Sequence, residues 1–167
     1  MNEIFARRST RRFLDRPVEP EKLERILRAA MQAPSAHNRQ DWEFLVVTDR
    51  EKILAVSQMS DVTVSAKNAP ALIIPLANHD RGQTEPLMWT CDLGAATENI
   101  LLQIEAEGLG GCWLSCWPYQ YKVDYLKKLF SLPAHITPYA VVTVGYKEKE
   151  KPFEDRWDPE KVHREVF

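Results

Sequence analysis

The sequence lacks the patterns that identify several large classes of protein. It has no apolar run close to the roughly 18 residues that a membrane-spanning helix needs, and its N-terminus has no apolar signal-peptide core. It also lacks G-x-G-x-x-G, G-x-x-x-x-G-K-S/T and G-x-S-x-G. These absences give no support to a membrane protein, a Rossmann or phosphate-loop nucleotide binder, or a hydrolase with a nucleophile elbow.

Cysteine is scarce, and neither sign of charge dominates. The three cysteines, Cys91, Cys112 and Cys116, favour a reducing compartment over a disulfide framework, so we expect a cytoplasmic protein. Cys112 and Cys116 have a spacing that zinc tolerates, but His79 and His135 are isolated and no second pair completes four ligands, so no metal is expected. With 22 basic against 24 acidic residues, the chain as a whole is not a polyanion binder.

The 167 residues predict a single domain, 1–167, and 44% hydrophobic content suffices for a core. Apolar periodicity predicts helices over 21–31, 49–59, 85–107 and 121–130, and β-rich runs predict strands over 42–48, 71–77, 112–114 and 139–146. This alternation indicates an α+β or α/β domain. Pro75 predicts that its strand lies near a sheet edge. Apolar residues cover much of the circumference of the helix predicted over 85–107, which indicates a helix that is buried on two sides. The second side can be covered by a partner subunit.

A basic run near the N-terminus is the densest candidate for function. Residues 7–12 hold four arginines around Ser9 and Thr10. The guanidinium N–H groups of arginine and the hydroxyl donors of serine and threonine suit the binding of a phosphate dianion. A solvated basic surface and a nucleic-acid contact are the other interpretations, and the near-neutral total charge disfavours the second.

Two more segments carry polar or thiol groups. Ser35, Asn38 and Gln40 in the loop 34–40 offer donors and acceptors for the edge of a planar heterocycle, although such residues are also common in turns. His37 in the same loop is more often a surface histidine than a base. In segment 110–117, small buried core residues are the plain interpretation of Cys112 and Cys116.

Taken in order, these segments resemble the FMN-dependent nitroreductase family. The resemblance covers nearly the whole chain and rests on residues 7–13, 17–18, 33–42, 107–114 and 144–146 and on Arg156. It implies an α+β fold with a mixed sheet flanked by helices, and a homodimer with FMN at the interface and the helix near 93–104 in the dimer core. No nucleic-acid or membrane partner is expected.

The resemblance also implies a set of cofactor-binding residues. Phosphate and flavin-edge contacts fall on Arg7, Arg8, Ser9, Arg11 and Arg156. Contacts from the other subunit fall on Pro34, Ser35, Ala36, Asn38 and Gln40. The resemblance implies that the backbone of Leu114, Ser115 and Cys116 passes the flavin ring near N5. Cys116 stands where many relatives have glycine, so its thiol could narrow the approach to the flavin.

The implied activity is ping-pong electron transfer at FMN. NADH or NADPH reduces the flavin, and a nitroaromatic, quinone or similar small acceptor reoxidises it, with no catalytic side chain required. Segment 78–86 is the one candidate for a short lid. A non-catalytic FMN carrier or sensor is the alternative function.

Overall fold

A five-stranded sheet forms the centre of the fold in the computed structural model, which describes residues 3–81 and 87–167. The strand order is β1 (Trp42–Val47), β2 (Ala71–Asn78), β5 (Ala140–Gly145) and β3 (Gly110–Ser115), and β4 (Ile136–Pro138) also pairs with β2. All four ladders are antiparallel, and Trp42 lies opposite Ala77 in the first of them. Parallel pairing in the described chain is confined to an isolated bridge between Ser9 and Gly111. The sheet was expected to be mixed, and this bridge is its one parallel contact within the described residues.

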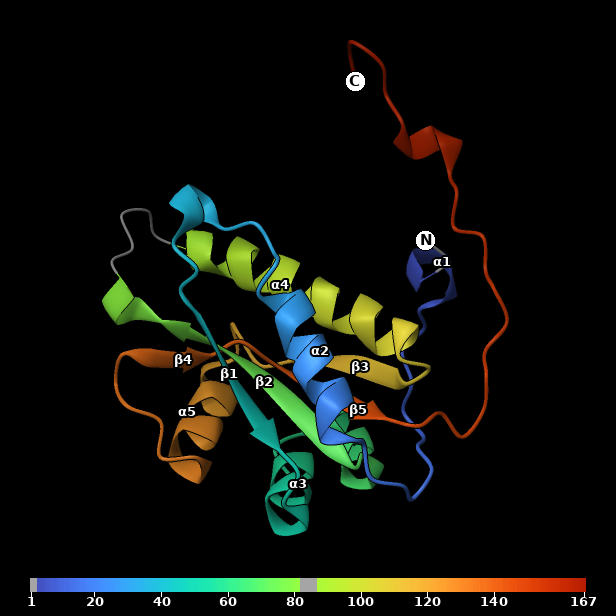
Figure 1. Cartoon of the computed structure of the whole chain (residues 1–167). Helices are drawn as coiled ribbons and strands as arrows, with labels where there is room; N and C mark the ends of the chain where they lie inside the picture. Colours follow the sequence, from blue (N-terminus) through green and yellow to red (C-terminus); the bar gives the residue numbers. More distant parts are fainter. Residues whose placement is uncertain (1–2, 82–86) are drawn as a thin grey trace.

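Helices cover both faces of this sheet, as Figure 1 shows. The helices α2 (Pro20–Ala30) and α4 (Met88–Ala106) pack on the face that carries Ile73 and Val142. The helices α3 (Arg50–Ser57) and α5 (Gln120–Leu129) pack on the face that carries Ile74 and Val141. Neighbouring strand residues therefore enter different cores, as the two-residue period of a strand requires.

The helices follow the sequence patterns closely. Asp49 caps α3 as expected, because its side chain accepts a hydrogen bond from the Lys52 N–H at 2.9 Å. The helix predicted from residue 85 begins at Met88, because Leu87 has a left-handed backbone with φ of 70°; residues 85 and 86 lie outside the described residues. Several short elements had no sequence prediction, among them β4, the 3₁₀ segment η2 (Asp61–Asn68) and the short η3 (His79–Arg81). Most of the predicted lid, at 82–86, also lies outside the described residues.

The strand that contains Pro75 lies near a sheet edge, as predicted, next to the edge strand β1, but it is itself an interior strand. β2 pairs with β1 on one side and with β5 and β4 on the other. Tyr139, the single residue between β4 and β5, donates its N–H to the Pro75 carbonyl at 2.9 Å. The missing N–H of Pro75 therefore falls where the partner strand is interrupted, and an interior strand tolerates the proline at that position.

Both chain ends lie at one side of the sheet. The N-terminal helix α1 (Glu3–Ala6) sits beside the far end of α4, and the segment after β5 runs past it, away from the body, to the single turn η4 (Pro159–Lys161) (Figure 1). Phe153 and Trp157 in this tail are 63% and 70% exposed. Within 3–81 and 87–167, none of the helices combines the length and apolar character of a bilayer span.

Candidate functional site

The arginine run is locked against the edge strand β3. The Thr10 N–H donates to the Gly111 carbonyl at 2.8 Å, and Ser9 forms the parallel bridge with the same glycine. A Cβ on Gly110 would lie 2.5 Å from Thr10 Oγ1, so the close approach of the two segments requires glycine there. Arg7 and Arg8 therefore lie before the contact with β3, and Arg11 lies after it.

Arg7, Arg8 and Arg156 meet at a first cavity, of about 320 Å³, between α1 and the tail. We call it the tail cavity; it is lined by Ile4, Phe5, Arg7, Arg8, Phe153, Glu154, Asp155, Arg156 and Trp157. One carboxylate serves two of the arginines: Glu154 Oε2 lies 2.8 Å from Arg8 Nη2 and 3.4 Å from Arg156 Nη2. Arg7 Nε lies 3.6 Å from Glu98 Oε1 on α4. An incoming anion would have to compete with Glu154.

Arg11, Leu114 and Ser115 meet at a second cavity, of about 450 Å³, beside β3. We call it the strand cavity; it is lined by Arg11, Asp61, Val62, Ser65, Trp113, Leu114, Ser115, Tyr119 and Lys122. Ser65 Oγ is buried and has no hydrogen-bond partner among the described residues. Lys122 Nζ donates to the Ser115 carbonyl at 3.0 Å. The wall of the cavity thus contains both a lysine and a buried hydroxyl without a hydrogen-bond partner among the described residues.

Sequence reasoning missed Ser65 and Lys122. Ser65 lies in η2, which has no regular apolar period from which a helix could be read. Lys122 precedes the inward-facing Val123 on α5, and a lysine at that position normally reaches solvent. Neither residue type gives a local signal of burial.

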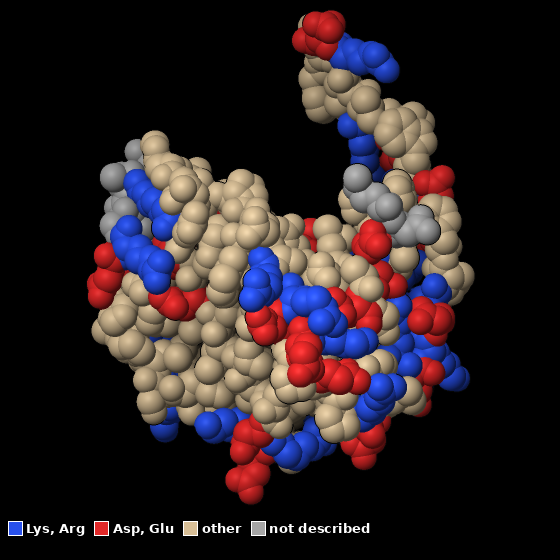
Figure 2. Space-filling model, viewed as in Figure 1, with Lys and Arg blue, Asp and Glu red and all other residues tan. Residues whose placement is uncertain are grey.

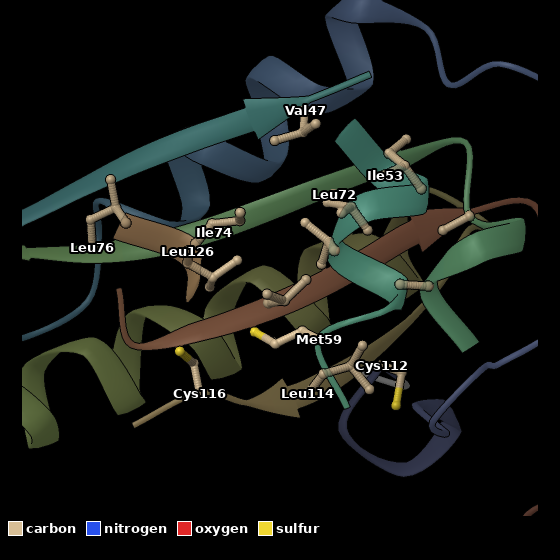
Figure 3. Packing of buried hydrophobic residues seen from close by; sticks show 14 of the residues in the cluster. Val47, Ile53, Met59, Leu72, Ile74, Leu76, Cys112, Leu114, Cys116 and Leu126 are labelled. Atoms are coloured by element: carbon tan, nitrogen blue, oxygen red, sulfur yellow. The ribbon is translucent and has the colours of Figure 1, made fainter. Parts of the chain in front are cut away.

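Cys116 does not contribute its side chain to the strand cavity. It is fully buried and belongs to the hydrophobic cluster that includes Met59, Leu114 and Leu126 (Figure 3). Burial raises the pKa of its thiol to about 12. The expectation that this thiol narrows the approach to a ligand is therefore not met in this arrangement, and only the backbone of Cys116 remains available. No group of three or more potential metal ligands occurs in the described parts of the chain.

The loop 34–40 is held by its own hydrogen bonds and by α4. The Ala36 N–H donates to Asp92 Oδ1 at 2.9 Å, and the Gln40 N–H donates to Ser35 Oγ at 3.0 Å. Gln40 Nε2 also donates to Asn38 Oδ1 at 2.7 Å. Burial raises the pKa of the Asp92 carboxyl, against the lowering effect of the Ala36 hydrogen bond. The polar groups of the loop are thus arranged by contacts that fix its backbone.

The backbone of this loop is also strained. His37, Asn38 and Gln40 all have positive φ, of 54°, 53° and 53°. Such angles are uncommon for residues other than glycine, and clusters of them occur at functional sites. The 3₁₀ turn η1 (Ala36–Asn38) contains two of the three.

The structure does not bring this loop to the arginines within one chain. The loop lies at the beginning of α4, whereas α1 and the arginine run lie toward its end (Figure 1). Pro34 and the other loop residues named above line neither the tail cavity nor the strand cavity. Ser9 lies between the two cavities, and its carbonyl accepts a hydrogen bond from Lys151 Nζ at 2.7 Å.

The protein has an α+β fold, because its sheet is antiparallel and helices cover both of its faces. An arginine-rich segment is bridged to the edge strand β3, and a polar site lies at this edge of the sheet. The chain belongs to the nitroreductase family, whose model matches residues 4–82 and 65–146. The family resemblance seen in the sequence is thereby confirmed, and so is the fold.

Relatives with similar sequences and structures agree with this membership. A protein of Archaeoglobus fulgidus named "Putative NADH dehydrogenase/NAD(P)H nitroreductase" is 40% identical over 98% of this chain and 96% of its own length. The crystal structure of a "Putative NADH Oxidase" from Clostridium acetobutylicum is 43% identical, with a TM-score of 0.95 over 99% of both chains. An FMN-dependent nitroreductase from Clostridium difficile R20291 is 32% identical, with a TM-score of 0.92 over 99% of both chains.

Proposed function

We propose that the protein is an FMN-dependent oxidoreductase that acts as a homodimer in the cytoplasm. When bound, FMN would take electrons from NADH or NADPH and pass them to a nitroaromatic, quinone or similar small acceptor in ping-pong order. The observation that carries the proposal is the strand cavity, where Arg11, Ser65 and Lys122 converge beside the end of β3. The names of the relatives, which include an FMN-dependent nitroreductase, support the same cofactor.

The strand cavity fits the flavin ring chemically. A flavin ring has an apolar body and a polar edge, and the lining of the cavity includes apolar residues, among them Trp113 and Leu114, as well as polar ones. The Ser65 hydroxyl can donate or accept one of the ring-edge hydrogen bonds, which would satisfy an oxygen that is otherwise buried without a partner. Arg11 and Lys122 are the cationic groups available to that edge.

The tail cavity fits the phosphate group in residue type. A phosphate dianion pairs with two or three arginines, and each charge-assisted hydrogen bond contributes on the order of 1.5–3 kcal/mol. Arg7, Arg8 and Arg156 are present for this role. Arg8 and Arg11 are three residues apart, a span of at most about 11 Å in an extended chain, so the ribityl part of FMN would follow the segment between the cavities.

The position of the loop 34–40 supports a site built from two chains. Its strained and ordered polar groups lie away from both cavities of their own chain, so a second copy is needed to place Pro34, Ser35, Ala36, Asn38 and Gln40 at the ring. The surface beside the loop, along the first part of α4, is largely uncharged, whereas charged side chains gather over α2 and near the chain ends (Figure 2). Such a surface suits burial against a partner.

A stopped-flow experiment tests the proposal. The FMN-loaded protein is mixed with NADH or NADPH without oxygen, and a panel of nitroaromatic and quinone acceptors is added afterwards. We expect the flavin absorbance to bleach and then recover with at least one acceptor. Bound flavin that neither coenzyme bleaches would identify a carrier or sensor instead. Sedimentation analysis in the same buffer checks the dimer.

A further inference from the structure

A buried lysine forms part of the wall of the strand cavity. Lys122 stands in the first turn of α5 and is only 4% exposed. Lysine is almost never buried to this degree unless its charge is paired. The groups that surround its ammonium therefore bear on whether the residue has a role beyond packing.

In the part of the chain that the structure describes, the partners of Lys122 are uncharged. Its Nζ donates to the Ser115 carbonyl at 3.0 Å and lies 4.6 Å from the ring centre of Tyr119 and 5.9 Å from that of Tyr121. No ion pair joins it to a carboxylate among residues 3–81 and 87–167, although Asp61 lines the same cavity. Carbonyl and aromatic contacts stabilise an ammonium group without cancelling its charge.

The charge is therefore available to whatever occupies the cavity. Arg11 lines the same space but is exposed, so water and salt screen it. Lys122 is shielded from solvent, and a charge in a less polar environment acts more strongly on its neighbours. Of the two cations, Lys122 has the larger electrostatic effect for the same distance.

We propose that Lys122 sets the reduction potential of the flavin by binding reduced FMN more tightly than oxidised FMN. This inference rests on the proposed function. Taking up two electrons and one proton, the equivalents that NAD(P)H transfers, leaves FMN with one more negative charge. A cation at the cavity wall favours the more negative form. A difference in affinity between two forms shifts the equilibrium between them by the same factor.

A purely structural role makes a different prediction. If Lys122 only anchors the end of β3 through the Ser115 carbonyl, a neutral donor at the same position would preserve the site, and the ratio of affinities for the two flavin forms would not change. Lys122→Gln keeps an N–H donor and removes the charge, and Lys122→Met removes both. Lys122→Arg keeps the charge and the donors.

The decisive measurement is the midpoint potential of FMN bound to each variant, determined against a redox dye, together with the dissociation constant of oxidised FMN. We expect Lys122→Met and Lys122→Gln to lose about tenfold in the preference for reduced FMN, which is about 30 mV for a two-electron couple. Lys122→Arg should stay close to wild type. Lys128→Met, which removes an exposed lysine from the same helix, is the matched control and should leave the potential unchanged.

The outcomes separate the inference from the function on which it rests. A wild-type potential in both neutral variants, with FMN still bound, overturns the role of Lys122 and leaves the proposed function intact. Failure of the wild-type protein to bind FMN overturns both. If circular dichroism shows that Lys122→Met does not fold, the contrast between Lys122→Gln and Lys122→Arg decides the same question.

Discussion

The two cavities contain the same kind of charge but differ in how their walls are built. The strand cavity is walled by β3, η2 and α5, and Leu114 and Lys122 in its lining are buried, although Val62 and Tyr119 are 61% and 51% exposed. The tail cavity is walled by α1 and a segment that lies outside the body, and Phe5, Phe153 and Trp157 around it are exposed. Two of its arginines pair with Glu154, whereas Lys122 hydrogen-bonds to a carbonyl and has no ion-pair partner among the described residues.

This difference indicates how the two ends of a ligand would be treated. A site on buried strands and helices holds its groups in place before the ligand arrives, which reduces the entropy lost on binding. A site on an exposed tail must be ordered by the ligand or by a partner chain. We therefore expect the ring end to determine the chemistry and the phosphate end to contribute affinity.

The largest expected contrast is in stability. Leu114→Ala removes a buried side chain from the wall of the strand cavity and should lower the free energy of unfolding by about 2–5 kcal/mol. Phe153→Ala removes an exposed side chain from the tail cavity and should change it by less than about 0.5 kcal/mol. Urea denaturation of the ligand-free protein measures both. Equal losses would mean that the tail packs as firmly as the sheet.

The next contrast is in FMN affinity. Arg11→Ala should weaken binding by roughly tenfold to a hundredfold, because it removes a charge-assisted contact that no described ion pair already engages. Arg8→Ala should weaken it less, since Arg8 must first give up Glu154. Fluorescence titration with FMN measures both constants.

Arg12→Ala is the matched control for this pair. Arg12 is exposed and lines neither of the two cavities, so its loss should leave the FMN dissociation constant within about twofold of wild type. Wild-type affinity in both Arg8→Ala and Arg11→Ala would return the arginine run to an ordinary solvated basic surface.

Glu154→Gln is expected to have a smaller effect on FMN affinity, and to increase it. This change removes the carboxylate that pairs with Arg8 and Arg156, so FMN should bind about two- to fivefold more tightly. Glu160→Gln, a charge loss elsewhere in the tail, serves as control. Weaker binding in Glu154→Gln would show that Glu154 orders the site rather than competing for it.

No detectable reaction is expected at Cys116. Because burial raises the pKa of its thiol to about 12, iodoacetamide at pH 8 should leave Cys116 unmodified in the native protein and modify it after unfolding. Peptide mass spectrometry after a timed reaction measures both states. Rapid native modification would mean that the thiol faces the strand cavity after all.

The fold was largely predictable because its signals are local. The apolar period of α2 and α4, the cap at Asp49 and the β-rich run of β5 each fix one element from neighbouring residues. The pairing of β2 on both sides could not be predicted, because it depends on a tertiary relation: Pro75 fits an interior strand where the partner strand is interrupted between β4 and β5.

The candidate site was only partly predictable for the same reason. Its arginines form a dense run that stands out in the sequence. Ser65 and Lys122 have no such pattern, and only the packing of η2 and α5 against β3 places them with Arg11. The sequence also contains no sign that Glu154 pairs with Arg8, a contact that spans most of the chain.

The most direct test is equilibrium titration of the purified wild-type protein with FMN, followed by flavin fluorescence and absorbance. We expect saturation at one FMN per chain with a dissociation constant in the micromolar range or tighter, about −8 kcal/mol or better. Absence of saturable binding at tens of micromolar protein would contradict the assignment of the two cavities to one flavin site.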